Sequence, residues 1–195
     1  IAGRLEDESG KFNLNSLVAE DGTVNEPAKK WFELILKRVG LPEQLSEAVI
    51  DWQDQDELPI GAMGAESIHY QGLPNAALPP NANFHSIEQL KLVRGFEENR
   101  YKLLLPYVTA APLKDTQVNI NTAPAALLAS LDDKLDVNAV QQALDLKFGK
   151  QEHFANISEL WQVAPFDQVA AENRNQFAKL LGVKSQFFKA RIEVM

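Results

Sequence analysis

The sequence has 195 residues, 27 of them acidic and 19 basic, and the resulting net charge of −8 argues against binding nucleic acid through its phosphate backbone. Cysteine is absent, which excludes disulfides, thiolate nucleophiles and thiolate metal sites. The hydrophobic content of 45% is ordinary for a globular protein, and no apolar run is long enough to span a bilayer.

Strand-like alternation occurs near both ends of the chain. In residues 11–17, Phe12 and Leu14 point to one face and polar side chains such as Asn15 point to the other, which predicts a strand with one buried face. Residues 188–194 alternate apolar with charged side chains and predict a second half-buried strand. Because an isolated edge strand is unstable, we expect the first and last segments to meet in one small antiparallel sheet.

The pattern between these segments is helical, with apolar residues at helical spacing. Asn25 and Thr122 are placed to cap helices, and Ser86 with Gln89 forms a capping box. Residues 58–84 are rich in proline and glycine and form a long connection of a kind that is usually functional or held in place. The predicted helices span residues 26–39, 42–52, 86–95, 97–105, 125–131, 136–148, 156–161 and 167–181.

The predicted class is α+β, with a large, mostly helical block inserted into a small sheet made by the two ends of the chain. The sheet part covers residues 1–22 and 183–195, and the helical block covers residues 23–182. A division of the block into two halves, 23–107 and 108–182, is the finer alternative.

The most informative stretch is acidic and spans residues 51–70. Four carboxylates fall within residues 51–57, and Glu66 follows after two glycines. No lysine or arginine lies between Arg38 and Lys91, so basic neighbours in the sequence cannot neutralise this charge. The stretch is therefore either a solvated acidic loop or a site for a hard cation with oxygen ligands, and calcium suits such ligands.

Two features of this stretch bear on the choice. Gly61 and Gly64 allow a turn tight enough to bring Glu66 back to the aspartates. The stretch is not an EF-hand, because Leu58 and Pro59 stand where that loop needs a ligand and a glycine. Both the solvated loop and a cation site of another kind remain open at this point.

No arrangement of residues indicates catalysis. The histidines, His69, His85 and His153, lie in separate places without a metal-binding spacing. The sequence contains no nucleophile elbow, zinc-protease motif or phosphate-binding glycine loop. Asp54 and Asp56 lie on one loop without an aromatic sugar groove, which disfavours a glycosidase pair. We therefore expect a protein that is not an enzyme.

Residues 119–123, Asn-Ile-Asn-Thr-Ala, resemble the entry to a helix-hairpin-helix (SAM-like) unit. Such units bind DNA phosphates through a glycine-containing hairpin. The corresponding residues 131–136 carry aspartates in place of the glycines, which would repel phosphate. A helix-hairpin-helix nucleic-acid-binding domain is the alternative function.

The whole chain resembles a more specific family, because five motifs occur in one order. They are Asp7-Glu8-Ser9-Gly10-Lys11-Phe12-Asn13-Leu14-Asn15, Asp51-Trp52-x-Asp54-x-Asp56, Gly64-Ala65-Glu66-x-x-x-Tyr70, Ser86-x-Glu88-Gln89-Leu90-x-x-Val93-x-Gly95 and Asn119-Ile120-Asn121-Thr122-Ala123. This order resembles protein K of the bacterial type II secretion system, a minor pseudopilin, over nearly the whole chain.

The resemblance implies a pilin-like sheet with an inserted helical domain, and an N-terminal hydrophobic helix, largely missing here, that anchors the protein in the inner membrane. It implies a periplasmic domain at the tip of the pseudopilus, in complex with minor pseudopilins I and J and without nucleic acid. The bulky inserted domain would block addition of a further subunit, so the protein would cap the pseudopilus and support secretion across the outer membrane.

Structural calcium binding is also a property of the family. Carried over to this sequence, the resemblance assigns the metal to Asp51, Asp54, Asp56 and Glu66, with Glu57 as the second choice. It assigns no catalytic residue and no organic cofactor.

Overall fold

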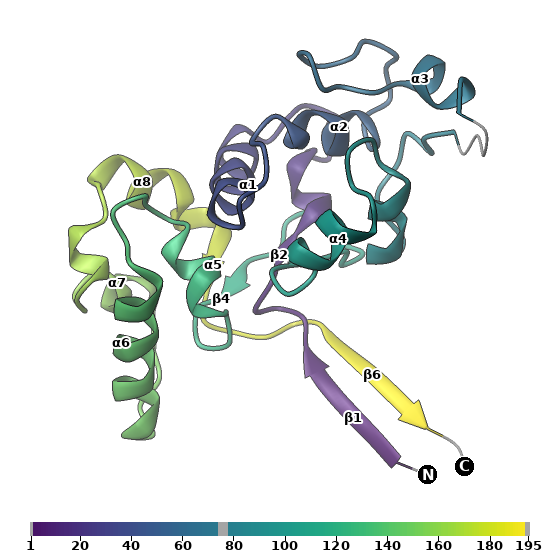
Figure 1. The fold of residues 1–195 in the computed structure, drawn as a ribbon. Helices are drawn as coiled ribbons and strands as arrows, with labels where there is room; N and C mark the ends of the chain where they lie inside the picture. The colour runs from purple at the N-terminus through teal and green to yellow at the C-terminus, as the bar shows by residue number, and fades with distance from the viewer. Residues whose placement is uncertain (1, 74–77, 194–195) are drawn as a thin grey trace. The chain divides into compact units, whose positions relative to one another are not determined.

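The computed structural model describes residues 2–73 and 78–193, and over these residues it combines short helices with small two-stranded sheets (Figure 1). A mixed helix-and-sheet class, as predicted, is confirmed. The chain forms two compact units. The terminal unit contains the residues up to Phe12 and those from Gln117 onward, and the central unit is Asn13–Thr116. The predicted pilin-like subdomain and the boundaries of the inserted block stay predictions.

The two ends of the chain pair with each other in the terminal unit, as expected. Strands β1 (Ala2–Asp7) and β6 (Phe188–Glu193) run antiparallel, with Leu5 opposite Ala190 (Figure 1). The first strand lies nearer the N-terminus than the alternation indicates. Val194, the last residue of the predicted second strand, lies outside the described residues.

The predicted strand at residues 11–17 is wrong for most of its length. Only β2 (Phe12–Asn13) is a strand, and η1 (Leu14–Leu17) is a 3-10 helix. The alternation misleads here because Asn13 and Asn15, exposed by 3% and 0%, are buried like their apolar neighbours. Their side chains hydrogen-bond to backbone groups, which offsets the cost of burying an amide.

The second strand lies where it is predicted, but it is not half-buried. One face of the β1–β6 pair carries Leu5, Phe188 and Ile192, which are 66%, 54% and 68% exposed. On the other face, Arg4 lies opposite Arg191, and both are exposed. A two-stranded ribbon exposed on both faces is marginally stable by itself, so it depends on the contacts at its base.

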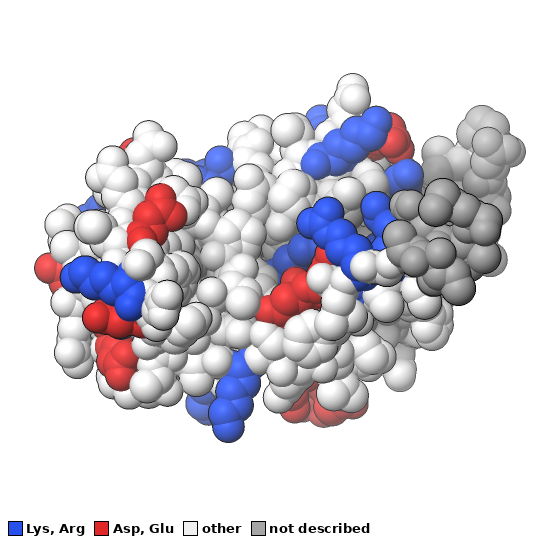
Figure 2. Space-filling model, turned by 90° about the horizontal axis from the view of Figure 1, so that it is seen from below, with Lys and Arg blue, Asp and Glu red and all other residues white. Residues whose placement is uncertain are grey.

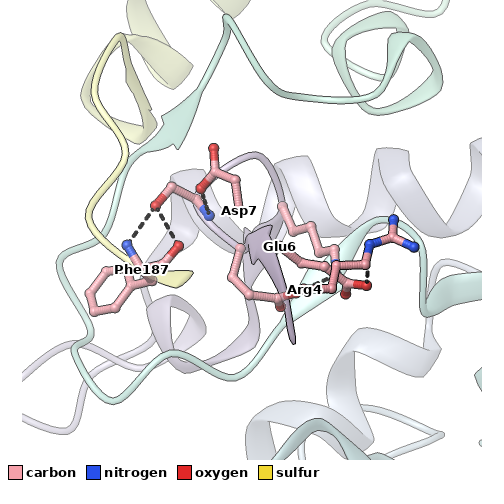
Figure 3. Close-up of polar contacts among 7 residues, drawn as sticks. Arg4, Glu6, Asp7 and Phe187 are labelled. Atoms are coloured by element: carbon pink, nitrogen blue, oxygen red, sulfur yellow. Dashed lines mark hydrogen bonds and ion pairs between the residues drawn. The ribbon is translucent and has the colours of Figure 1, made fainter. Parts of the chain in front are cut away.

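Hydrogen bonds accepted by the side chains of Asp7 and Ser9 hold the base of this ribbon (Figure 3). Ser9 Oγ accepts the backbone N–H groups of Gln186 at 2.8 Å and Phe187 at 2.9 Å. Asp7 accepts the Ser9 N–H at 2.9 Å and the Ser185 hydroxyl at 2.6 Å. Burial raises the pKa of Asp7, but the hydrogen bonds it accepts, led by that from Ser185, hold the pKa below its ordinary value.

The motif that begins at Asn119 packs at the same base. The Asn119 N–H donates to the Ser9 carbonyl oxygen at 2.7 Å. A Cβ at Gly10 would lie 2.6 Å from the carbonyl oxygen of Thr122, so this close approach requires glycine. The prediction that Thr122 caps the next helix is wrong, because Pro124 stands at the N-cap.

Short helices complete the terminal unit. A parallel pair, β4 (Val118–Asn119) and β5 (Leu181–Gly182), joins its two ends. Predicted helices are confirmed near residues 125–131, 136–148 and 156–161, whereas the one at 167–181 is broken by 3-10 turns. The elements are α5 (Ala125–Ala129), α6 (Val137–Gly149), α7 (Ile157–Leu160), η3 (Phe166–Gln168), α8 (Ala171–Phe177) and η4 (Ala178–Leu180).

The central unit is built on two helices that pack against each other, α1 and α2. Its elements are α1 (Glu26–Arg38), α2 (Leu45–Asp51), α3 (Ser67–Gln71), η2 (Ile87–Leu92), α4 (Glu98–Leu104) and β3 (Val108–Thr109), which pairs with β2. Asn25 caps α1, as predicted. The Ser86–Gln89 capping box also forms, although it opens a 3-10 helix rather than an α-helix. The sequence pattern does not predict α3.

Asn15 connects the end of the long 58–84 connection to the core of the central unit. Its Nδ2 donates to the carbonyl oxygens of Phe84 at 3.0 Å and Ala111 at 2.8 Å. Its Oδ1 accepts the Phe84 N–H at 2.7 Å. One fully buried amide therefore satisfies three backbone groups from two distant segments.

We expect Asn15→Ala to destabilise the protein strongly, because it leaves these three buried backbone groups without their partner. Each such group costs roughly 1–3 kcal/mol, so the free energy of unfolding should fall by about 3 kcal/mol or more in urea denaturation. Asn99→Ala, an exposed position on α4, is the control and should change it by less than about 0.5 kcal/mol. Equal losses in the two variants would contradict the role of Asn15.

Candidate cation site

Two carboxylates on α2 draw the following loop back onto the helix. Asp51 accepts the Ile60 N–H with both oxygens at 3.2 Å, and its Oδ2 also accepts the Ala65 N–H at 2.7 Å. Glu47 Oε2 accepts the Met63 N–H at 2.8 Å. Glu47 and Asp51 are four residues apart and share one face of the helix, so the loop folds against that face.

Gly61 and Gly64 make this loop feasible, as the sequence predicts. Gly61 has a φ of +59°, where any other residue would be strained. A Cβ at Gly64 would collide with Asp51 Oδ2 and the carbonyl oxygen of Ile60. The loop can therefore return Glu66 to the end of α2 because both positions lack a side chain.

Three of the four predicted ligands come together. Asp51, Asp54 and Glu66 each offer a carboxylate oxygen, and these oxygens lie within 4.8 Å of one another. The three residues are only 0%, 7% and 2% exposed. Asp56, the fourth predicted ligand, is exposed and lies outside this group, where its Oδ1 accepts the Leu58 N–H at 2.7 Å.

Glu57, the second choice from the sequence, has other partners. Its carboxylate accepts the Ser67 N–H at 3.2 Å and the Ser67 hydroxyl at 2.9 Å. It also accepts the Asn81 side-chain amide at 3.4 Å. Glu57 therefore fastens the start of α3, and the roles of Asp56 and Glu57 as ligands stay predictions.

Asp54 and Glu66 have buried carboxylate oxygens that lack protein partners. Asp54 Oδ1 and both Glu66 oxygens are buried without a hydrogen bond from any residue that the structure describes. Buried polar atoms are nearly always paired, and a buried carboxylate without a partner is costly. An oxygen-only donor set with unsatisfied oxygens fits a hard cation such as calcium.

Burial and the charges of neighbouring carboxylates raise the pKa of all three clustered carboxyls. Burial, with the charges of Asp56 and Glu47, raises the pKa of Asp51 to about 6. Burial, with the charges of Asp51 and Asp56, raises the pKa of Asp54 to about 6. Burial, with the charges of Asp51 and Asp54, raises the pKa of Glu66 to about 8. Without a cation, the cluster therefore retains protons close to neutral pH.

A basic residue that the sequence does not point to also contacts this loop. Arg94 Nη1 donates to the Gly64 carbonyl oxygen at 2.9 Å, across 30 positions of sequence. In the described part of the chain, no ion pair joins a lysine or arginine to the three clustered carboxylates. No local pattern marks a contact over this distance in sequence, so only the structure reveals it.

Other residues that the sequence draws attention to do not join the site. His69 contacts the Tyr70 ring edge-on at 5.1 Å and is not part of the carboxylate group. Asp132, in the predicted hairpin, accepts the Ala170 N–H at 3.0 Å and the Asn173 amide at 3.2 Å. On the face drawn in Figure 2, basic side chains are interspersed with acidic ones. These observations give no support to the nucleic-acid-binding alternative.

Comparisons with known proteins show that the chain is similar to a component of a bacterial secretion apparatus. Two family profiles described as type II secretion system (T2SS), protein K match residues 10–113 and 118–184. Together they cover most of the chain, including the carboxylate cluster. The chain therefore belongs to the protein K family of the type II secretion system.

Individual relatives agree with this assignment. Type II secretion system protein K of Aeromonas hydrophila is 32% identical, over 98% of this chain and 61% of that protein. The protein of the same name from Pectobacterium carotovorum subsp. carotovorum is 31% identical, over 100% of this chain and 61% of that protein. The chain thus spans about three fifths of the length of these relatives.

The fold also matches a solved structure. A chain of the GspK-GspI-GspJ complex from the type 2 secretion system of enterotoxigenic Escherichia coli aligns with a TM-score of 0.83. The alignment covers 97% of this chain and 68% of that chain, at 24% identity. At this identity the match is evidence for the fold alone.

We expect the metal-free protein to lose stability as the pH rises. The folded-state pKa values of about 6 for Asp51 and Asp54 and about 8 for Glu66 exceed the ordinary values of 3.8 and 4.5. The stability these groups contribute is therefore fully present below about pH 4 and lost as the pH rises through 6 to 8. Urea denaturation in EDTA over this pH range measures the free energy of unfolding of the metal-free protein.

Glu66→Gln should remove the upper part of this decline, between about pH 6 and 8, because the amide does not titrate. Glu172→Gln, at an exposed position on α8, is the control and should leave the decline unchanged. The same pH profile for wild type and Glu66→Gln would show that Glu66 does not titrate as described.

Proposed function

We propose that the chain is the periplasmic part of a minor pseudopilin that caps the tip of the type II secretion pseudopilus with minor pseudopilins I and J. Membership of the protein K family carries this proposal. The fold match to a chain of a complex named for its K, I and J components supports it. In this role the protein supports secretion across the outer membrane by assembly rather than by catalysis.

The protein acts through its shape in this proposal. The β1–β6 ribbon forms the pilin-like sheet and packs with the partner pseudopilins, while the helical part prevents addition of a further subunit. The exposed apolar side chains Leu5, Phe188 and Ile192 support this, because a ribbon exposed on both faces needs a covering surface. Among residues 2–73 and 78–193, no helix combines the length and apolar character needed to cross a membrane. An anchoring helix before these residues belongs to the proposal.

We expect the chain to co-elute with soluble domains of minor pseudopilins I and J in size-exclusion chromatography at micromolar concentration. The double variant Phe188→Ser/Ile192→Ser should lose this co-elution, because it removes the two largest apolar side chains from one strand of the ribbon. Circular dichroism reports whether the variant remains folded.

Leu146→Ser is the matched control, because Leu146 on α6 is also 68% exposed but lies outside the ribbon. It should co-elute like the wild type. Failure of the wild type to bind I and J would contradict the assembly role. Normal binding by the double variant would contradict the ribbon as the contact surface.

We also propose that Asp51, Asp54 and Glu66 bind a structural calcium ion that fastens the 58–84 connection to α2. The unpaired buried oxygens of Asp54 and Glu66 carry this proposal, because a cation would satisfy them and neutralise their repulsion. Asp56 is proposed as a fourth, more exposed donor. Calcium sites in extracellular modules bind at roughly 10⁻⁴–10⁻³ M, which sets the concentration range for a test.

We expect millimolar calcium to raise the Tm of the chelator-treated protein, and EDTA to reverse the rise. A ligand at about 1 to 10 times its Kd stabilises the folded state by about 0.4–1.4 kcal/mol. Asp54→Asn and Glu66→Gln should abolish the rise, because each removes an anionic donor from the cluster. Asp56→Asn should reduce it by less. Differential scanning calorimetry measures all four proteins.

Magnesium is the chemical control and should have a smaller effect, because it requires a near-ideal octahedral set of ligands. Glu172→Gln is the protein control and should keep the full calcium response. A wild-type Tm that does not respond to calcium would rule out the site.

A further inference from the structure

Arg94 makes two hydrogen bonds to the loop that carries Glu66. Its guanidinium Nη1 donates to the Gly64 carbonyl oxygen at 2.9 Å. Its backbone N–H donates to Tyr70 Oη at 3.1 Å. One residue between η2 and α4 therefore holds the chain two residues before Glu66 and four residues after it.

Tyr70 connects this arrangement to the aspartate side of the cluster. Its ring is 1% exposed and lies edge-on to Trp52, with centroids 5.5 Å apart. Trp52 directly follows Asp51 and stacks on Phe84 at 6.3 Å. The carbonyl oxygen of Glu66 accepts the Tyr70 N–H at 3.4 Å, so a backbone hydrogen bond links Tyr70 to Glu66.

We propose that Arg94 is a positioning residue for the cation site: it holds Gly64 and Tyr70 so that the Glu66 carboxylate lies beside Asp51 and Asp54 before a cation binds. This inference depends on the calcium site proposed above. Arg94 is suited to the role because its guanidinium bonds a backbone carbonyl and forms no ion pair with the three carboxylates in the described chain. It orders the loop without occupying the place of the cation.

The reasoning is that of preorganisation. If the loop is held in place beforehand, binding a cation does not have to order it. Without Arg94, the cation would have to order Gly64, Glu66 and Tyr70 when it binds. The free energy needed for this ordering would weaken the observed binding. A hydrogen bond from a charged donor is strong enough for its loss to weaken binding by about tenfold or more.

The test is isothermal titration calorimetry of calcium into chelator-stripped Arg94→Met, which keeps the side-chain length and removes the guanidinium. The calcium Kd should rise about tenfold with unchanged stoichiometry. Arg94→Lys retains a donor that can reach the Gly64 carbonyl and should recover most of the affinity. Tyr70→Phe removes only the acceptor for the Arg94 N–H and should weaken binding by a smaller factor.

Arg100→Met is the matched control. Arg100 is also half-buried, and its Nη1 donates to a backbone carbonyl oxygen, that of Gly95, at 3.0 Å. The control therefore makes the same change of charge and removes the same kind of bond away from the Glu66 loop, together with an ion pair to Glu97 at 3.8 Å. Its calcium Kd should remain within about twofold of the wild type.

A second measurement separates positioning from general stability. A merely structural Arg94 would lower the Tm equally in EDTA and in calcium, so the rise produced by calcium would be unchanged. A positioning Arg94 makes that rise smaller, because the rise depends on Kd. Equal calcium Kd values for Arg94→Met and Arg100→Met would overturn the inference while leaving the calcium site intact.

The remaining outcomes are also decisive. No calcium binding by the wild type would remove the calcium site and this inference with it. If Arg94→Met does not fold, Tyr70→Phe decides. If Tyr70→Phe binds calcium with the wild-type Kd, the proposal is overturned. If Tyr70→Phe has a raised calcium Kd while Arg94→Lys keeps a Kd near that of the wild type, the proposal is supported.

Discussion

Buried negative charge at the end of α2 is the constraint around which the central unit is arranged. Asp51, Asp54 and Glu66 are almost fully buried, and their mutual repulsion adds to the cost of burial. Asp51 offsets part of this cost by accepting backbone N–H groups from the loop. Asp54 Oδ1 and both Glu66 oxygens are buried without a hydrogen bond from any described residue, so protons or a cation must balance their charge.

In the terminal unit, the two ends of the chain, which are far apart in sequence, are joined to each other. Ser9 and Asp7 do so with short polar side chains that bond the backbone around Ser185 and Phe187. These bonds lie at the base of the β1–β6 ribbon and fix where it begins. The ribbon beyond them contributes little buried area to this chain, because its large apolar side chains are exposed.

Much of the helical fold follows from the sequence, because caps act locally. Asn25 and the Ser86–Gln89 box mark real helix starts, since the bonds they make lie within one turn. The strand expected around Asn15 fails for a different reason. An alternating pattern shows which residues are polar, but it does not show which of them find hydrogen-bond partners in the core. Asn15 is buried because it bonds to Phe84 and Ala111, and the sequence does not distinguish it from an exposed asparagine.

The candidate site was predictable to a similar degree. Charge density and the two glycines indicate that Glu66 returns to Asp51 and Asp54, because both signals are local. The density of acidic residues also predicts Asp56 as a ligand, although its side chain is exposed. Spacing in the sequence does not determine which side of a turn a carboxylate occupies. Arg94 lies beyond any local pattern.

The absence of cysteine explains why such a site is useful. The 58–84 connection is long, and closing a long loop costs conformational entropy that a cross-link could offset. In a chain without disulfides, the connection is held by Asn15 at one end and by Glu57 near the other. The calcium ion proposed between α2 and Glu66 would add a third tether that uses the charge these residues already bury.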